Sequence, residues 1–303
     1  MTTSKRVRFA QATLLSTAAV LMAAPAVSHA AEPAALSASQ LKAQGKVRVV
    51  VAFKAGAGAA ARAAIAAAGG RTVLDLADLN AVAIEVPRKA LALLQRNPNV
   101  EFAEEDGVRH ALGNTSKAPL RTAVAAVAAG SQVVPYGIPM VQADQVSDSL
   151  AAGRKLCIVD SGYDLAHEDL AGNTVDGVNL TTSGQWSTDE LGHGTHVAGT
   201  IAAVNNDLGV IGVLPNKNIR LHIAKVFDAS GSAPTSIIVK GMLACMKAKA
   251  NVVSMSLGGA SAQKIEEKVV DLMARRNMLL IAAAGNAGTS AVSYPAEIGR
   301  AHV

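Results

Sequence analysis

Hydrophobic and polar positions divide the chain into two patterned regions joined by an unpatterned one. Between residues 46 and 103, short apolar runs that predict strands alternate with Ala-rich and Leu-rich stretches that predict helices. Residues 111–130 are rich in Ala, Thr, Ser and Gly without periodicity, which predicts a linker. We expect this linker to contain the processing region, with a cut anywhere from about His110 to Ser131. From about residue 131, continuous apolar runs alternate with helical stretches. This pattern is typical of parallel strands covered by helices on both faces.

The first patterned region predicts a small α+β domain at 46–110, with the β-α-β-β-α-β order of a ferredoxin-like split unit. Gly69 and Gly70 end its first predicted helix, and Pro87 opens the second. The expected strands are 46–53, 72–76, 81–86 and 100–103, and the expected helices are 59–68 and 88–96. We find no catalytic constellation in this domain. A tether is expected before it, at 31–45.

The second patterned region, 131–297, predicts an α/β domain with a doubly wound, mostly parallel sheet. Its expected strands are 155–159, 221–226, 251–256 and 278–283, and its expected helices are 193–204, 234–250 and 261–276. Sheets of this kind carry their sites at the carboxyl ends of the strands. The expected site residues at these strand ends are therefore Asp160, Phe227, residues 256–259, Gly285 and Asn286.

The first 30 residues predict a signal peptide. Lys5, Arg6 and Arg8 precede an apolar run at 12–27, and Ser28-His29-Ala30 offers small residues for cleavage. The run is too short for a transmembrane anchor. We therefore expect a secreted protein with no membrane attachment after the signal is removed.

Composition narrows the possible partners and the redox chemistry. The formal charge of +5 is spread over the chain with no basic stripe, so we expect no nucleic-acid partner, and we expect a monomer. The only cysteines are Cys157 and Cys245, both in apolar contexts. Export permits a disulfide between them, and two buried thiols are the alternative.

Two short segments carry candidate chemistry. Asp160 ends a predicted buried strand in "VDSG", where an acid can be a cap, a metal ligand or the partner of a histidine. His193 and His196 lie three apart in "GHGTHVAGT", at the start of a predicted helix. The zinc-binding helix motif spaces its histidines four apart and has a Glu between them, which this segment lacks. A metallohydrolase using both histidines is therefore only an alternative.

"VDSG", "GHGTHVAGT", "SMSLGG" and "AAAGN", in this order, resemble the subtilisin family of serine endopeptidases. The segments "NAVAIEVP" and "NPNVEFAEED" are similar to the subtilisin propeptide, an intramolecular chaperone and inhibitor. The resemblance covers about residues 46–296. It implies that Asp160 orients His193, that His193 is the general base for a serine, and that Asn286 stabilises the oxyanion. His196 is expected to be structural, packed under the site.

The resemblance also implies binding sites for substrate, propeptide and calcium. An extended polypeptide substrate, or the chain's own propeptide in cis, would pair with an edge strand at 256–258. The residues implied for substrate binding are Phe227, Ser232, Ala233, Ser256, Leu257, Gly258, Ala283 and Gly285. A structural Ca²⁺ is implied at one extended loop and its neighbours. The implied ligands are Gln132, Asp169, Val204, Asn206, Leu208 and Val210.

The family's nucleophilic serine lies in a turn that opens a helix, and no such turn occurs here. Ser290 lies in "AGTSAV", directly after Asn286 and with no predicted helix behind it, so we reject it. Residues 298–303 can be encoded by a common sequencing-adapter sequence, and we expect this tail to be non-native. The expectation is a fragment without turnover, with the serine beyond its end. A catalytically inactive protein whose propeptide acts as inhibitor or chaperone is the alternative.

Overall fold

The computed structural model describes residues 36–113 and 132–299, which lie in one compact unit, Ala35–Val303. The predicted signal peptide (1–30), most of the predicted linker and the end of the predicted tail fall outside the described residues. Among the helices of the described residues, none has the length and apolar character needed to cross a membrane.

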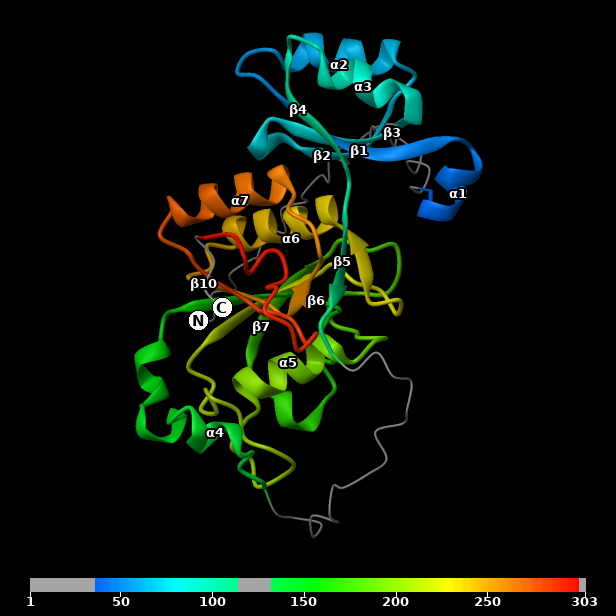
Figure 1. Ribbon diagram of the computed structural model, residues 1–303. Coiled ribbons are helices and arrows are strands. Elements are labelled where there is room, and N and C mark those ends of the chain that lie inside the picture. Colours follow the sequence, from blue (N-terminus) through cyan, green and yellow to red (C-terminus); the bar gives the residue numbers. More distant parts are fainter. Residues whose placement is uncertain (1–35, 114–131, 300–303) are drawn as a thin grey trace, which may run out of the picture. The chain divides into compact units, whose positions relative to one another are not determined.

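An antiparallel four-stranded sheet covered by helices on one face forms the N-terminal module (36–107; Figure 1). The strand order is β2-β3-β1-β4, which confirms the predicted ferredoxin-like order. One sheet face packs against the helices through apolar side chains such as Val49, Ile65 and Ile84. Its elements are β1 (Lys46–Phe53), α2 (Gly58–Ala67), β2 (Arg71–Leu76), β3 (Ala81–Pro87), α3 (Leu91–Gln95) and β4 (Val100–Glu105), with 3-10 turns at Ala77–Leu79 and Arg88–Ala90.

Two predictions for this module were wrong in detail. The expected tether contains helix α1 (Ala38–Ala43), because Ser37 and Gln40 form a capping box at its start. The expected helix 88–96 is a 3-10 turn followed by the shorter α3, which ends at Gln95.

The larger domain (132–299) is built on a five-stranded parallel sheet with the order β12-β10-β6-β8-β7. Helices α6 and α7 pack on one face, against residues such as Val159 and Val253, and α5 packs on the other, against Ile158 and Ile223 (Figure 1). This confirms the doubly wound α/β class. The strands are β6 (Lys155–Asp160), β7 (Thr174–Asn179), β8 (Arg220–Lys225), β10 (Val252–Met255) and β12 (Leu279–Ala282). The helices are α4 (Gly137–Met140), α5 (His193–Ala202), α6 (Thr235–Lys247) and α7 (Lys264–Ala274), with 3-10 turns at Ala143–Gln145, Asp148–Ala151 and Glu168–Leu170.

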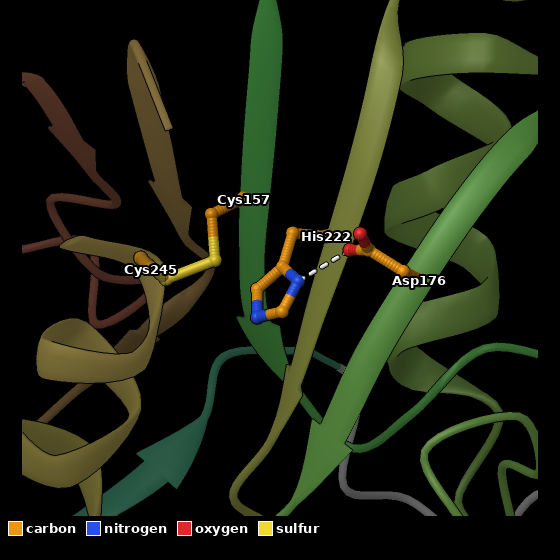
Figure 2. Close-up of a disulfide and its surroundings, with 4 residues drawn as sticks. All are labelled: Cys157, Asp176, His222 and Cys245. Atoms are coloured by element: carbon orange, nitrogen blue, oxygen red, sulfur yellow. Dashed lines mark hydrogen bonds and ion pairs between the residues drawn. A yellow bond between two sulfur atoms is a disulfide. The ribbon is translucent and has the colours of Figure 1, made fainter. Parts of the chain in front are cut away.

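A disulfide fastens α6 to the centre of this sheet. Cys157 of β6 is bonded to Cys245 of α6, and both side chains are fully buried (Figure 2). On the neighbouring strands, His222 of β8 pairs in register with Cys157, and its Nδ1 lies within hydrogen-bond distance of Asp176 of β7. Of the two alternatives for the cysteines, the structure contains the disulfide.

A separate three-stranded sheet joins the two halves of the chain. Strand β5 (Val108–Ala111) lies between β11 (Leu257–Gly258) and β9 (Ser232–Pro234), antiparallel to both. The described chain continues to Gly113. Residues 111–113 therefore lie against the larger domain, where the sequence predicted the start of a free linker.

The N-terminal module also caps two helices of the larger domain. Both carboxylate oxygens of Glu104 accept backbone N–H groups at the start of α7, from Lys264 and Ile265. Asp106 accepts the backbone N–H and the hydroxyl of Ser236 at the start of α6. The N-cap positions of these helices make no side-chain cap of their own. The module therefore supplies the anionic groups that satisfy both helix N-termini.

Candidate active site

Asp160 and His193 meet at the carboxyl end of the central strand β6. The Asp160 Oδ1 atom lies 2.7 Å from His193 Nδ1 and accepts the Ser161 backbone N–H at 2.7 Å. Asp160 is fully buried, while a part of the His193 ring remains accessible. The two residues are 33 positions apart, and β6 and the start of α5 bring them together. This is the pair that the sequence motifs suggested.

Close backbone contact sets the position of the His193 helix. An added Cβ on Gly194 would lie 2.3 Å from the Gly162 carbonyl oxygen, so only glycine fits there. The Gly194 N–H donates to Ser161 Oγ at 2.9 Å. The turn after β6 therefore holds the first turn of α5 directly through backbone atoms.

Two supporting residues were not identified from the sequence. Asp189 accepts the Gly192 N–H, the Thr195 N–H and the Thr195 hydroxyl, at 2.9, 2.8 and 2.7 Å, and so caps α5. Burial alone would raise the pKa of Asp189, but the donors from Thr195 and Gly192 outweigh it and lower that pKa. An Asp three residues before the glycine N-cap was the available signal.

Lys225 is the second residue that was missed. It is fully buried at the end of β8, where it pairs in register with Asp160. Its Nζ donates to the Ser161 carbonyl at 2.7 Å and forms an ion pair with Glu190. Lys225 thereby ties the loop before α5 to the turn after β6.

Strand β5 lies along the site and presents a carbonyl group to His193. The Leu112 N–H donates to the Ser256 carbonyl at 2.9 Å, and the Leu112 carbonyl oxygen lies 3.1 Å from His193 Nε2. An added Cβ on Gly113 would lie 3.1 Å from the His193 ring. The Leu112–Gly113 peptide bond is therefore the one beside the histidine.

Both nitrogens of His193 face oxygen atoms, which favours the doubly protonated ring. The hydrogen bond that His193 donates to Asp160 raises the pKa of His193, against the opposing effect of burial. Burial raises the pKa of Asp160, and its hydrogen bonds to His193 and Ser161 act in the opposite direction. An imidazolium ring would satisfy both Asp160 Oδ1 and the Leu112 carbonyl oxygen.

Most residues expected to bind substrate line the path of β5. Ser232 and Ala233 pair with His110 and Arg109, and Leu257 and Gly258 pair with Ala111 and His110. An added Cβ on Gly258 would lie 3.0 Å from Leu112 Cδ1, so the Leu112 side chain packs against this glycine.

The remaining three residues expected to bind substrate lie outside the strands that pair with β5. Phe227 is fully buried in the same apolar cluster as Ala111. Ala283 is partly buried and donates its N–H to the Met255 carbonyl. Gly285 has φ +114 and would bring a Cβ within 2.7 Å of Ser293 Oγ.

Three other candidates lie at the surface. Asn286, the expected oxyanion donor, is exposed in a loop after β12. Ser290 is exposed in the same loop, and between it and Gly299 the described chain forms no helix. His196 is also exposed, so the expectation that it packs under the site was wrong. It lies on the solvent side of α5, whereas Gly194 and Ala198 are buried.

The residues expected to bind calcium converge around the side chain of Gln132. Its amide Nε2 lies within hydrogen-bond distance of the Val204 carbonyl (2.7 Å), the Val210 carbonyl (3.1 Å) and Asn206 Oδ1 (3.3 Å). Asp169 is buried beside them, and its Oδ1 has no hydrogen-bond partner among the described residues. Leu208 lies in the same loop and donates its N–H to Asn206 Oδ1.

Comparison with known proteins identifies both halves of the chain. Residues 151–301 match the subtilase family (Peptidase_S8), and residues 39–106 match the fervidolysin N-terminal prodomain. The chain belongs to the subtilase family. Its N-terminal module is a prodomain of the fervidolysin type.

Two curated relatives and two solved structures illustrate the similarity. Subtilisin DY of Bacillus licheniformis is 40% identical over 173 residues, which are 55% of this chain and 62% of the relative. Subtilisin E of Bacillus subtilis (strain 168) is 35% identical over 236 residues, 76% of this chain and 56% of the relative. The psychrophilic subtilisin-like protease Apa1 of Pseudoalteromonas sp. AS-11 aligns with TM-score 0.54 and 44% identity over 56% of this chain and 40% of that one. Fervidolysin of Fervidobacterium pennivorans, described as a keratinolytic enzyme related to subtilisin, aligns with TM-score 0.63 over 83% of this chain and 41% of that one.

Identity with fervidolysin is 20%, so this alignment supports the shared fold alone. The chain spans 56–62% of the length of the two subtilisins. The family assignment therefore covers the subtilase domain and the prodomain.

Proposed function

We propose that this subtilase is the precursor of a serine endopeptidase that hydrolyses peptide bonds in extended polypeptides. The observation that carries the proposal is the 2.7 Å contact between Asp160 and His193 beside the Leu112 carbonyl. In this mechanism Asp160 fixes the His193 tautomer, and neutral His193 removes the proton from a serine hydroxyl. Asn286 donates to the oxyanion of the tetrahedral intermediate. We assign no nucleophile among the described residues.

The proposal predicts a labelled serine. The protein expressed from the complete gene should react with a fluorophosphonate probe and hydrolyse peptides, and His193→Ala should abolish both. Ser290→Ala is the control and should retain both. Loss of labelling or hydrolysis in Ser290→Ala would show that Ser290 is the nucleophile, which the proposal denies. Complete inertness of the wild-type protein would favour an inactive subtilase whose prodomain serves as inhibitor or chaperone.

We infer that the Leu112–Gly113 bond is the first bond cut, in cis. Its support is that β5 pairs on both sides with the subtilase domain and that the next residue, Leu112, places its carbonyl oxygen 3.1 Å from His193 Nε2. Sequencing the N-terminus of the processed protein should give Gly113 as the first residue, with no processing in His193→Ala. A first cut within residues 114–131 would contradict this assignment.

The prodomain is proposed to inhibit the enzyme until that cut and to assist its folding. Inhibition follows from its occupation of the peptide-binding strands. Assistance to folding is supported by the caps that Glu104 and Asp106 provide to α7 and α6. Replacing both by alanine should slow refolding of the full chain, as measured by recovery of Trp186 fluorescence. Replacing Glu105, which is exposed and pairs with Arg88 of the same module, is the control.

A structural Ca²⁺ is proposed at Gln132, Asp169, Val204, Asn206, Leu208 and Val210. The donor set suits the ion, because it combines a buried carboxylate, two side-chain amides and backbone carbonyls. The unpartnered Asp169 Oδ1 supports the fit. When bound, the ion would neutralise Asp169 and fasten the loop after α5 to the start of the subtilase domain. A chelator should lower the melting temperature of the wild type but not of Asp169→Asn, and equal shifts in both would count against the site.

Export is proposed from the predicted signal peptide at 1–30. The buried Cys157–Cys245 disulfide supports it, because such bonds persist in oxidising compartments. Detection of the protein in the culture medium with its first 30 residues removed tests the proposal, and retention of those residues would contradict it.

A further inference from the structure

Arg109, in the middle of β5, carries a fully buried positive charge into the subtilase domain. Its side chain has no exposed surface, and neither has that of Glu266 in α7. Arg109 Nε donates to Glu266 Oε1 at 3.0 Å and Nη2 donates to Oε2 at 2.6 Å, so the pair is bidentate. Nη2 also donates to the Ser261 carbonyl at 3.0 Å.

The surrounding backbone is shaped to admit a guanidinium group. An added Cβ on Gly259 would lie 2.6 Å from Arg109 Nη1 and 3.1 Å from its Cδ, so a side chain at 259 would close the recess. Ala233 of β9 pairs with Arg109 in register and is small. The recess therefore has a small residue on each side and a carboxylate at its base.

The position of this recess relative to the cut bond follows from the strand register. Leu112 donates to Ser256, Ala111 pairs with Leu257, and His110 pairs with Gly258. Arg109 is therefore the fourth residue counted back from the Leu112–Gly113 bond. A substrate that replaces β5 between β11 and β9 would present its own fourth residue to Glu266.

A buried carboxylate in this place requires a cationic partner. Burial raises the pKa of Glu266, and its hydrogen bonds to Arg109 oppose that effect. Taking an unpaired carboxylate out of water is strongly unfavourable, and an apolar fourth residue would leave the buried charge of Glu266 without compensation. Arg matches the two oxygens of Glu266 better than Lys, because its donors form a planar fork.

We propose that Glu266 is a specificity-determining residue that selects substrates with arginine four residues before the cleaved bond. The inference rests on the proposed peptidase activity, and it defines the substrate class as peptides of the form Arg-x-x-Leu. The prodomain sequence Arg109-His110-Ala111-Leu112 is the first such peptide.

The first test measures binding in the full chain and does not require turnover. Hydrogen exchange of the Ala111 and Leu112 amides reports how firmly β5 is held. Arg109→Leu and Glu266→Leu should each reduce protection at least about 100-fold, since each leaves half of a buried ion pair. The double variant Arg109→Leu/Glu266→Leu should recover most of that loss, because an apolar pair is tolerated. Additive losses in the double variant, or no loss in the single ones, would overturn the proposal.

The second test measures selectivity with fluorogenic peptides and processed enzyme. Wild-type enzyme should hydrolyse Arg-His-Ala-Leu-Gly with a kcat/KM at least about 10-fold above that for Leu-His-Ala-Leu-Gly, as expected for one charge-assisted pair. The Lys peptide should fall between them, and Glu266→Leu should prefer the Leu peptide. Equal rates for all peptides would overturn the proposal. If the wild type hydrolyses neither peptide, the proposed peptidase activity fails, and the exchange experiment alone decides whether Glu266 selects arginine.

Discussion

Helix α5 contains two glycines, Gly194 and Gly199, whose replacement by alanine should have opposite effects on stability. An alanine Cβ at Gly194 would lie 2.3 Å from the Gly162 carbonyl oxygen, which is backbone and cannot rotate away. At Gly199 no atom lies within 4 Å of the added Cβ. The same chemical change on the same helix therefore meets a closed site in one case and open space in the other.

The expected magnitudes follow from these contacts. Gly199→Ala should stabilise the protein by up to about 1 kcal/mol, because alanine loses less backbone entropy in a helix. Gly194→Ala should destabilise it by about 1–3 kcal/mol, since α5 must separate from the turn after β6. That displacement moves His193 as well, so its contact with Asp160 should weaken.

Urea unfolding measured by tryptophan fluorescence suits this comparison. Trp186 is the only tryptophan of the chain and packs against the apolar cluster that contains Ala198 of α5. The midpoint should fall for Gly194→Ala and stay or rise for Gly199→Ala, with similar slopes. A Gly194→Ala midpoint equal to or above that of the wild type would refute the argument that close backbone approach positions the helix.

Four further outcomes are expected. Asp189→Ala should destabilise the chain by about 1–3 kcal/mol in urea unfolding, because three donors lose their acceptor. The wild type should be more stable than Asp189→Asn above about pH 4. Because the pKa of Asp189 is lowered in the folded protein, this difference should disappear as the pH falls through that lowered pKa. Replacing Cys157 and Cys245 by alanine should cost on the order of 4 kcal/mol, since the bond closes a loop with a sequence separation of 88. In an NMR titration Asp160→Asn should lower the raised pKa of His193 toward about 6.5; no change would show that Asp160 is not its cause.

The parallel sheet could be predicted because its central strands are continuous apolar runs. The end of strand β6 is buried on both faces of the sheet, and a strand buried in this way requires consecutive apolar residues, which can be recognised in the sequence. Strand β7 was missed because Thr174–Asn179 is polar, contains Gly177 and lies at the edge of the sheet. Strand β9 has three residues and ends in proline, which gives no periodic signal.

The candidate site was predictable where a residue acts through its own side chain and local motif. Asp160 and His193 lie in short glycine-containing segments at element ends. Arg109 gave no signal, because an arginine in a strand is ordinarily exposed and its partner lies 157 residues away. Lys225 is buried by carbonyl groups and an acid from two other segments, an arrangement that only the folded chain creates.

Strand β5 is the middle strand of its sheet, and this has a consequence for the protein after processing. Removal of β5 by the proposed processing would leave β9 and β11 as two unpaired strand edges, separated by about 10 Å, which is twice the spacing of neighbouring strands. Such edges can pair with an extended segment of another copy of the chain. The processed domain therefore carries the same hazard of edge-to-edge association as an open β-sheet, and its solubility should depend on concentration and on how quickly a peptide fills the gap.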